Sequence, residues 1–552
     1  MIASFETILG LLAAVLLMEG AARRLRVPSS AMLVAGGIVL AVVPEAPSLE
    51  LDPDLILLLF LPPLLFSSAY FTVWGDFRAN LRPISQLAVG AVAFTTLAVA
   101  LVSRLLFPGL PWAACFALGA IVSPPDAVAA KAVLKGLPLP SRLVTLLEGE
   151  SLVNDAAGLV LFRVAITAGV TGSFDVWNAL GEFAVVSAGG VATGLVFGQL
   201  LALALRRVAT AELNIVGGML GAWGAYVGGD LLHVSGVLST AACGLVVGWK
   251  QHEVLPAKTR TEANAVWNVA VFLLESLIFV LIGLALRGVV QRLHEDGIPP
   301  LSLAVPAAGV ATAMVVARFA WIIPTTYLGR FLFPGLRRHD PYPSMGVPVV
   351  MSWAGMRGVV SLAVALSLPQ AFPARDTLLA VTLAVVLASI LLQGTTLASL
   401  IRALRLGGFQ LEVPPTLDEA HTRARVYGAA LDAIRLASHR RDGGERHPRL
   451  LEQYGYRLTM AERRAAVGAA EHGPERRAHY EAVLAANKAA RLELLRLHRA
   501  GRIHDSVLAG LEAELDLEEL GARHVLAEAE LCAGRPAPPP GLLVPRPTEA
   551  GP

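Results

Sequence analysis

The chain has 552 residues, of which 55% are hydrophobic and 16% are charged, and this balance excludes an ordinary soluble domain and favours a polytopic membrane protein. Its formal net charge of +2 gives no basic excess, which argues against nucleic acid as a partner. The three cysteines, Cys115, Cys243 and Cys532, lack the spacing of a zinc site or a disulfide framework, and we expect free thiols.

Hydrophobic stretches of about 20 residues, long enough to cross a bilayer, recur up to about residue 404. We count about thirteen of them. The first has no basic n-region and no obvious cleavage site, so we expect a membrane span and not a signal peptide. The stretches cover residues 4–22, 29–44, 55–74, 86–107, 112–134, 141–169, 179–205, 213–229, 232–249, 266–290, 301–328, 347–369 and 377–404.

The distribution of Lys and Arg predicts the orientation, because these residues concentrate in cytoplasmic loops. With the N-terminus outside, about eighteen Lys and Arg residues fall in cytoplasmic loops and about four fall outside. The loss of one central stretch would scramble this ratio. We therefore expect an external N-terminus and a cytoplasmic C-terminus in a bacterial-type inner (plasma) membrane.

The stretch at 112–134 carries Ser123-Pro124-Pro125-Asp126 near its middle. Two prolines remove two backbone donors and disfavour helix before them, so the span is expected to break into half-helices. At membrane depth such a break is tolerated where it lines a cavity or is buried in protein. The Pro125 carbonyl is then a candidate ion ligand, and Asp126 is a candidate partner for the positive end of a half-helix. A simple proline kink capped by Asp126 is the structural alternative.

The next stretch contains Glu150 and Asp155 in the sequence ESLVND. Ionisable groups inside hydrocarbon are costly and are functional candidates by default. Ser151 and Asp155 are four residues apart, so they share a helix face and offer a hydroxyl and a carboxylate to one ion. Glu150 points elsewhere and needs a separate partner, for which Arg318 and Arg357 both qualify. For each acid, a structural pair with an arginine is the alternative.

Arg357 lies between Gly355 and Gly358 inside the apolar stretch at 347–369. Glycines at this spacing favour a second unwound helix, in which Arg357 would balance the negative C-terminal ends of half-helices. Two interrupted helices, one in each half of the membrane part, match inverted-repeat transporters that bind their ion near the bilayer midplane. We prefer this interpretation to two accidental kinks.

After about residue 410 the charge becomes dense, and Leu and Ala recur at helical spacing. We assign residues 1–408 to a transmembrane domain, 409–535 to a helical cytoplasmic tail and 536–552 to a Pro-rich disordered end. The tail sequence shows neither a nucleotide-binding glycine loop nor a metal constellation. A solvated helical appendage and a regulatory or dimer-contacting domain both remain open.

Six segments follow one another along the chain: SPPDAVA, LEGESLVND, HVSGVL, ESLIFVLIGL, ARF and GMRGVVSLA. With them, over about residues 5–405, the chain resembles the sodium/proton exchangers of the cation:proton antiporter superfamily, in the NhaP/NHE-like branch. Their joint order and spacing are specific. The resemblance implies an all-α polytopic membrane protein with inverted repeats and two crossed, broken helices, in which a core of six helices rocks against a flatter scaffold.

The resemblance also implies roles for individual residues. Asp155 is implied to be the carboxylate that binds the cation and the proton, with Ser151 supporting the ion. Asn154 is implied to link its span to the broken helix before it. The same pattern pairs Glu150 with Arg318 and leaves Arg357 to balance helix ends. Members of this family are homodimers joined through the scaffold, which implies a homodimer here.

Some positions depart from the family pattern. Pro125-Asp126 stands where many relatives have Thr-Asp, so no threonine side chain can coordinate an ion there. Ser67 and Ser68 stand where bacterial relatives often have an acid, and Glu275 stands where an uncharged residue is frequent. The preference among Na+, K+ and Li+ is therefore left open.

We expect a monovalent cation:proton antiporter that contributes to pH homeostasis, a secondary active transporter and not an enzyme, without a cofactor. A cation such as Na+ needs about five or six oxygens, which Asp155, Ser151, freed carbonyls and water can supply. Burial favours the protonated form of a carboxylate, so protons and cations would compete for Asp155. With Asn154 in place of a second acid, one-for-one and electroneutral exchange is the simplest stoichiometry.

Proteins of other classes offer competing interpretations. A cation-coupled organic-solute symporter can share the broken-helix fold, but it requires a solute-sized polar cavity. An intramembrane aspartyl protease needs a GxGD-like segment, and the nearest sequence, residues 226–230, lacks the glycine spacing. A channel is less suited to a single titratable carboxylate than alternating access is.

Overall fold

The computed structural model describes residues 2–25, 27–42, 53–126, 130, 134, 139–171, 176–208, 210–295, 297–332, 340, 342–404, 419–438, 446–467, 473–500, 502–503 and 505–533. The chain divides into two compact units, Met1–Phe409 and Gln410–Pro552, next to the boundary that the sequence predicts at residue 408. The Pro-rich end at 536–552 lies outside the described residues.

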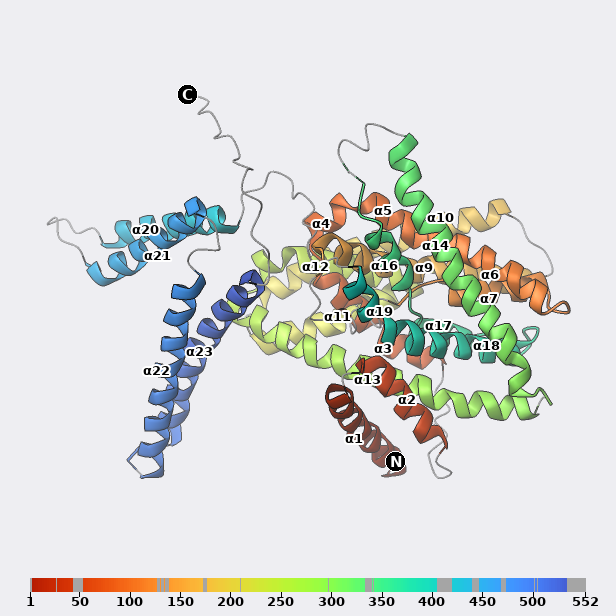
Figure 1. The fold of residues 1–552 in the computed structure, drawn as a ribbon, viewed down its shortest axis with the longest axis horizontal. Helices are drawn as coiled ribbons and strands as arrows, with labels where there is room; N and C mark the ends of the chain where they lie inside the picture. Colours follow the sequence, from red (N-terminus) through yellow and green to blue (C-terminus); the bar gives the residue numbers. More distant parts are fainter. Residues whose placement is uncertain are drawn as a thin grey trace. The chain divides into compact units, whose positions relative to one another are not determined.

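The first unit is helical throughout its described residues, which contain no strand (Figure 1). Three short segments have π or 3₁₀ geometry: η1 (Gln86–Ala91), η2 (Pro300–Leu303) and η3 (Ser389–Gln393). The α-helices are α1 (Ile2–Leu25), α2 (Ser29–Val42), α3 (Pro53–Tyr70), α4 (Trp74–Ala79), α5 (Leu81–Ser85), α6 (Val92–Leu106), α7 (Trp112–Val122), α9 (Ser141–Thr171), α10 (Val176–Arg207), α11 (Ala211–Leu231), α12 (Gly236–Val254), α13 (Ala257–Glu295), α14 (Ala304–Leu332), α16 (Gly346–Trp353), α17 (Val359–Leu366), α18 (Arg375–Ala388) and α19 (Gly394–Ala403).

Among the described residues, six continuous helical segments are long and apolar enough to cross a membrane: Leu81–Leu106, Arg142–Val170, Gly181–Arg207, Ala257–Glu295, Pro300–Leu332 and Arg375–Ala403. Three shorter apolar helices accompany them: Ser29–Val42, Leu58–Tyr70 and Trp112–Val122. The multi-pass character expected from composition is therefore present. The total of about thirteen spans and the inverted repeats stay predictions.

Helix α13 is longer than the apolar stretch that it contains. The sequence predicts a span at 266–290, whereas the helix runs for 39 residues from Ala257 to Glu295. At a rise of about 1.5 Å per residue, it is longer than the roughly 30 Å hydrocarbon layer. Charged residues such as Lys258 and Glu262 at its start are good helix formers, so the helix continues past the apolar stretch.

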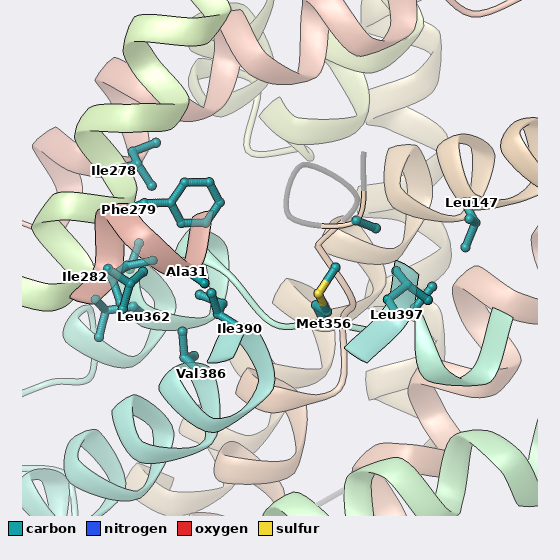
Figure 2. Close-up of a cluster of buried hydrophobic side chains, with 14 of the residues drawn as sticks. Ala31, Leu147, Ile278, Phe279, Ile282, Met356, Leu362, Val386, Ile390 and Leu397 are labelled. Carbon is teal, nitrogen blue, oxygen red and sulfur yellow. The ribbon is translucent and has the colours of Figure 1, made fainter. Parts of the chain in front are cut away.

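The largest group of buried apolar side chains surrounds the second expected interruption (Figure 2). It joins α2, α9, α13, α17 and the α18–α19 segment, through residues such as Ala31, Leu147, Ile282, Leu362 and Ile390. Met356, from the segment between α16 and α17, belongs to the same group. The interrupted backbone is thus enclosed by side chains from several helices and shielded from lipid, as non-helical backbone at membrane depth requires.

The second unit consists of four helices in its described residues: α20 (Glu419–Ser438), α21 (Pro448–Val467), α22 (Gly473–Arg499) and α23 (Asp505–Ala533). Helix α20 packs on α21, and α22 packs on α23. Arg491 of α22 donates hydrogen bonds to Asp516 (2.6 Å) and Glu519 (3.1 Å) of α23. The described residues of this unit are thus helical, and a regulatory role stays a prediction.

The thiols of Cys115 and Cys243 are free and buried. The side chain of Cys532 lies outside the described residues. Among the described residues no group of three or more His, Cys, Asp or Glu side chains is placed to hold a metal ion.

Candidate functional site

Two non-helical segments of the first unit meet, and we call them the first and the second interruption. Helix α7 ends at Val122 and is followed by Ser123–Asp126, while α16 ends at Trp353 and α17 begins at Val359. The Asp126 amide donates to the Met356 carbonyl at 2.7 Å, which joins the two unwound backbones directly. Such a bond replaces a helical partner that each segment has lost. The expected second half of the first broken helix falls mostly outside the described residues. Between 127 and 138, the structure describes only Ala130 and Leu134.

Arg357 belongs to the second interruption, and its side chain contacts the helix end before the first. Its side chain is fully buried, and Nε donates to the carbonyl of Val122, the last residue of α7. Its Nη1 donates to the Gly355 carbonyl of its own segment. A guanidinium at this position balances the partial negative charge at the C-terminal end of α7. The role of Arg357 in balancing helix ends during transport stays a prediction.

Asp126 belongs to the first interruption, and its carboxylate contacts the second. A Cβ atom built on Gly358 would overlap the Asp126 carboxylate, so this carboxylate lies directly against the Gly358 backbone. Gly358 is the N-cap of α17. The negative charge therefore stands at the positive N-terminal end of that half-helix, where it is stabilising. The contact also explains the glycine at 358, because any larger residue would displace the carboxylate.

Asn154 ties α9 to the first interruption. It is fully buried, and its Nδ2 donates to the Pro125 carbonyl at 2.6 Å. A carbonyl oxygen has two lone pairs, so Pro125 keeps one for a further donor or cation. The Asn154 Oδ1 atom has no hydrogen-bond partner among the described residues. The role of Pro125 as an ion ligand stays a prediction.

Asp155 follows Asn154 on α9 and is 6% exposed, while Ser151, one turn earlier, is half-buried. The charge of the Asp126 carboxyl group acts on that of Asp155. The structure therefore places the Asp155 carboxylate beside the residue that contacts the first interruption, with the Ser151 hydroxyl one helical turn away on α9. These are the oxygen donors that a hard cation requires.

Glu150 and Arg318 form a buried ion pair. Arg318 on α14 donates to the Glu150 carboxylate at 2.7 and 3.2 Å, and both side chains are 2% exposed. The same guanidinium donates to the Met351 carbonyl in α16 at 3.1 Å. Of the two arginines that the sequence leaves open for Glu150, Arg318 is the one in contact. The pair connects α9, which carries Asp155, to the helix before the second interruption.

Of the positions that depart from the family pattern, Pro125 and Asp126 belong to this set of contacts, whereas the hydroxyl of Ser67 bonds within its own helix. Ser67 donates to the Leu64 carbonyl of its own helix at 2.9 Å, although α3 packs against both α9 and α17. Ser68 is half-buried on the same helix. Glu275 is half-buried on α13. No described contact assigns these residues to the ion.

Sequence reasoning missed several polar residues that contact the interruptions. Ser123 and Thr96 of α6 share a hydrogen bond of 2.9 Å between their hydroxyls. Ser389 accepts a hydrogen bond from the Arg357 amide at 3.0 Å. The available signal was a hydroxyl or amide side chain inside an apolar span, where such groups often bond to a neighbouring helix.

Known proteins match both the sequence and the fold. The family model for the sodium/hydrogen exchanger transmembrane domain matches residues 10–403. An uncharacterised Na+/H+ exchanger of Mycobacterium tuberculosis is 32% identical over 524 residues, which cover 93% of this chain and 95% of the relative. A sodium, potassium, lithium and rubidium/H+ antiporter of Bacillus subtilis is 30% identical over 381 residues, which cover 66% of this chain and 56% of the relative.

A solved structure shares the fold. The sodium proton antiporter MjNhaP1 of Methanocaldococcus jannaschii aligns with a TM-score of 0.58 at 20% sequence identity, over 74% of this chain and 99% of the antiporter. The matches describe a membrane transporter of the cation:proton antiporter type and not an enzyme. The chain belongs to the sodium/hydrogen exchanger family.

Proposed function

We propose that this protein exchanges a monovalent cation for protons at Asp155, by alternating access. The observation that carries the proposal is the position of Asp155: a buried carboxylate next to Asn154, whose amide is bonded to the first interruption. Removal from water favours the protonated form of a carboxylate, so a cation and a proton compete for this group. Exchange follows if the site changes sides only when it is occupied.

The cation would bind to oxygen atoms of the interruption and of α9. Asp155 and Ser151 supply side-chain oxygens, the Pro125 carbonyl has a free lone pair, and water completes the shell. Asp126 contributes negative charge from the edge of the site, where it also faces the start of α17. We propose that Na+ is transported and that K+ and Li+ also fit, in keeping with the range named for the Bacillus relative.

Electroneutral exchange is part of the proposal. Asn154 is neutral, and Asp126, Glu150, Arg318 and Arg357 each face a helix end or an opposite charge. Asp155 is then the group whose charge changes during transport. One monovalent cation would therefore replace one proton, without a cofactor.

The setting proposed for this activity is a bacterial-type plasma membrane, where exchange would contribute to pH homeostasis. We propose an external N-terminus, a cytoplasmic C-terminus and a homodimer. Lys and Arg placement supports the orientation. The solute-symporter alternative has no comparable support, because the relatives are named as cation/proton antiporters.

The test is proton flux in proteoliposomes. Purified protein is reconstituted with an internal pH-sensitive dye, and Na+, Li+ or K+ is added in turn at several pH values. We expect cation-driven proton movement in the wild type and none with Asp155→Asn. The matched control is Asp230→Asn, the same change at an exposed acid of α11, which should transport normally. Normal flux in the Asp155→Asn variant would refute the proposal, and a dependence of turnover on membrane potential would refute electroneutrality.

A further inference from the structure

Each interrupted helix is held by a polar side chain of the helical segment that follows it. In the first case, Asn154 of α9 donates to the Pro125 carbonyl, 29 residues earlier. In the second, Ser389 of η3 accepts from the Arg357 amide, 32 residues earlier. The two side chains thus come from segments that follow their interruptions by about the same number of residues. Asn154 supplies a donor to a carbonyl, and Ser389 supplies an acceptor to an amide.

We propose that Ser389 is a positioning residue for the ion site. It acts through the backbone of the second interruption and does not itself touch the ion. This inference rests on the proposed function and extends it to a residue on the far side of the crossing.

The geometry of Ser389 suits an anchor. The side chain is 4% exposed and stands at the first residue of the π-helical segment η3. Its hydroxyl proton points to the Val386 carbonyl at 2.9 Å, which leaves its lone pairs for the Arg357 amide. A π-turn widens the helix by one residue, and such segments are frequent at functional sites. Here the π-turn places a side-chain oxygen against a neighbouring unwound backbone.

One peptide group, between Met356 and Arg357, connects the anchor to Asp126. Ser389 fixes the Arg357 amide, and the preceding carbonyl, that of Met356, accepts the Asp126 amide at 2.7 Å. Asp126 in turn acts on Asp155 through its charge. Loss of the Ser389 oxygen leaves a buried amide without an acceptor, and the interruption must shift to find another. The position of Asp126 relative to Asp155 shifts with it.

The experiment compares Ser389→Ala with Ser389→Thr and Thr382→Val. Thr382 lies on α18, is buried, and its hydroxyl has no partner among the described residues, so its replacement by an isosteric valine is the matched control. Transport is measured over a range of Na+ concentrations and pH values. Amide hydrogen exchange of the peptide around 354–358 is measured on the same reconstituted proteins, because it reports on the anchor without relying on transport.

We expect Ser389→Ala to raise the half-saturating Na+ concentration about fivefold, the factor that one net hydrogen bond represents, and to speed exchange at 354–358 by a similar factor. Ser389→Thr retains the oxygen and should restore both values, and Thr382→Val should change neither. If Ser389→Ala does not fold, Ser389→Cys keeps the volume with a weaker acceptor and should show the same direction.

Wild-type half-saturation together with wild-type exchange at 354–358 in a folded Ser389→Ala or Ser389→Cys protein would overturn the inference. A different result separates the two proposals. If the wild type shows no cation-driven proton flux, the proposed function fails, while the exchange comparison still decides whether Ser389 holds the interruption.

Discussion

The two interruptions meet at one place but are built from different residues. The first contains Pro124 and Pro125, which lack amide protons, so it offers carbonyl oxygens without competing donors. The second contains Gly355 and Gly358, which keep their amides and have no Cβ. The Asp126 carboxylate packs against Gly358, and the Arg318 guanidinium packs against Gly355. Prolines therefore expose acceptors in one half, and glycines make room for charged groups in the other.

The helical segments that follow the two interruptions also differ in their residues. Asn154 and Ser389 both contact the preceding interruption, but the residue after Asn154 is Asp155, whereas the residue after Ser389 is Ile390. Only the first half thus has an acid beside its anchor. Under the proposed function, ion and proton binding belong to the first half, and the second half balances charge.

The largest expected effect comes from the ion pair that joins the halves. Arg318→Met leaves Glu150 buried without its partner, which destabilises a protein by about 3–5 kcal/mol. We expect a steep loss of thermal stability in detergent and little folded protein. The double variant Glu150→Leu with Arg318→Met removes both charges and should recover much of the stability. A stable Arg318→Met single variant would mean that the two halves do not depend on this pair.

Gly358 tests whether the space beside Asp126 is needed. Gly358→Ala places a methyl group where the carboxylate lies, and we expect a loss of about 1–3 kcal/mol in stability together with reduced transport. Gly218→Ala on α11 is the matched control, because nothing lies within 4 Å of its Cβ position. Equal behaviour of the two variants in thermal denaturation and flux would contradict the placement of Asp126 at the start of α17.

Features with a local cause could be predicted from sequence. Two adjacent prolines remove donors wherever they occur, so the interruption at Ser123–Asp126 followed from the residues alone. The glycines around Arg357 gave the second interruption in the same way. The apolar spans followed from length and composition.

Features that depend on tertiary contacts could not be derived locally. The helical geometry showed that Glu150 needs a partner but left Arg318 and Arg357 equal, since the choice depends on how α9 and α14 cross. Ser389 resembles any serine that bonds to its own helix, and only the neighbouring segment makes it an anchor. The ends of α13 contain charged residues that favour helix, and a search for apolar stretches does not detect them.

A cluster around Asp340 joins α9 and α14 without a described contact to either interruption. Arg142 at the start of α9 donates to Asp340 at 2.7 and 3.0 Å and to Asn80 at 2.9 Å. Arg330 near the end of α14 donates to the same carboxylate at 2.7 Å. Because Asp340 precedes α16, the cluster connects the helix of Asp155 with the segment leading to the second interruption.

Loss of the Asp340 carboxylate is expected to have the smallest effect on stability, and this effect should depend on pH. Burial acts to raise the pKa of Asp340, but hydrogen bonds and charges of Arg142 and Arg330 outweigh it and lower that pKa below its usual value. The folded state then binds this proton less tightly than the unfolded state. The contribution to stability is therefore complete above the ordinary pKa of 3.8 and disappears as the pH falls through the lower, folded value.

We expect Asp340→Asn to cost about 1 kcal/mol at pH 7, since the group is partly exposed and its charge is screened. Denaturation of wild type and variant in detergent should show this gap at pH 7, and the gap should narrow below about pH 3.8. Asp230→Asn should show no gap at either pH. The half-saturating Na+ concentration should stay unchanged in Asp340→Asn, because the cluster has no described contact with either interruption. A changed half-saturating Na+ concentration with unchanged stability would contradict this expectation. It would mean that the Asp340 cluster affects ion binding, and that the division into a binding half and a balancing half is wrong.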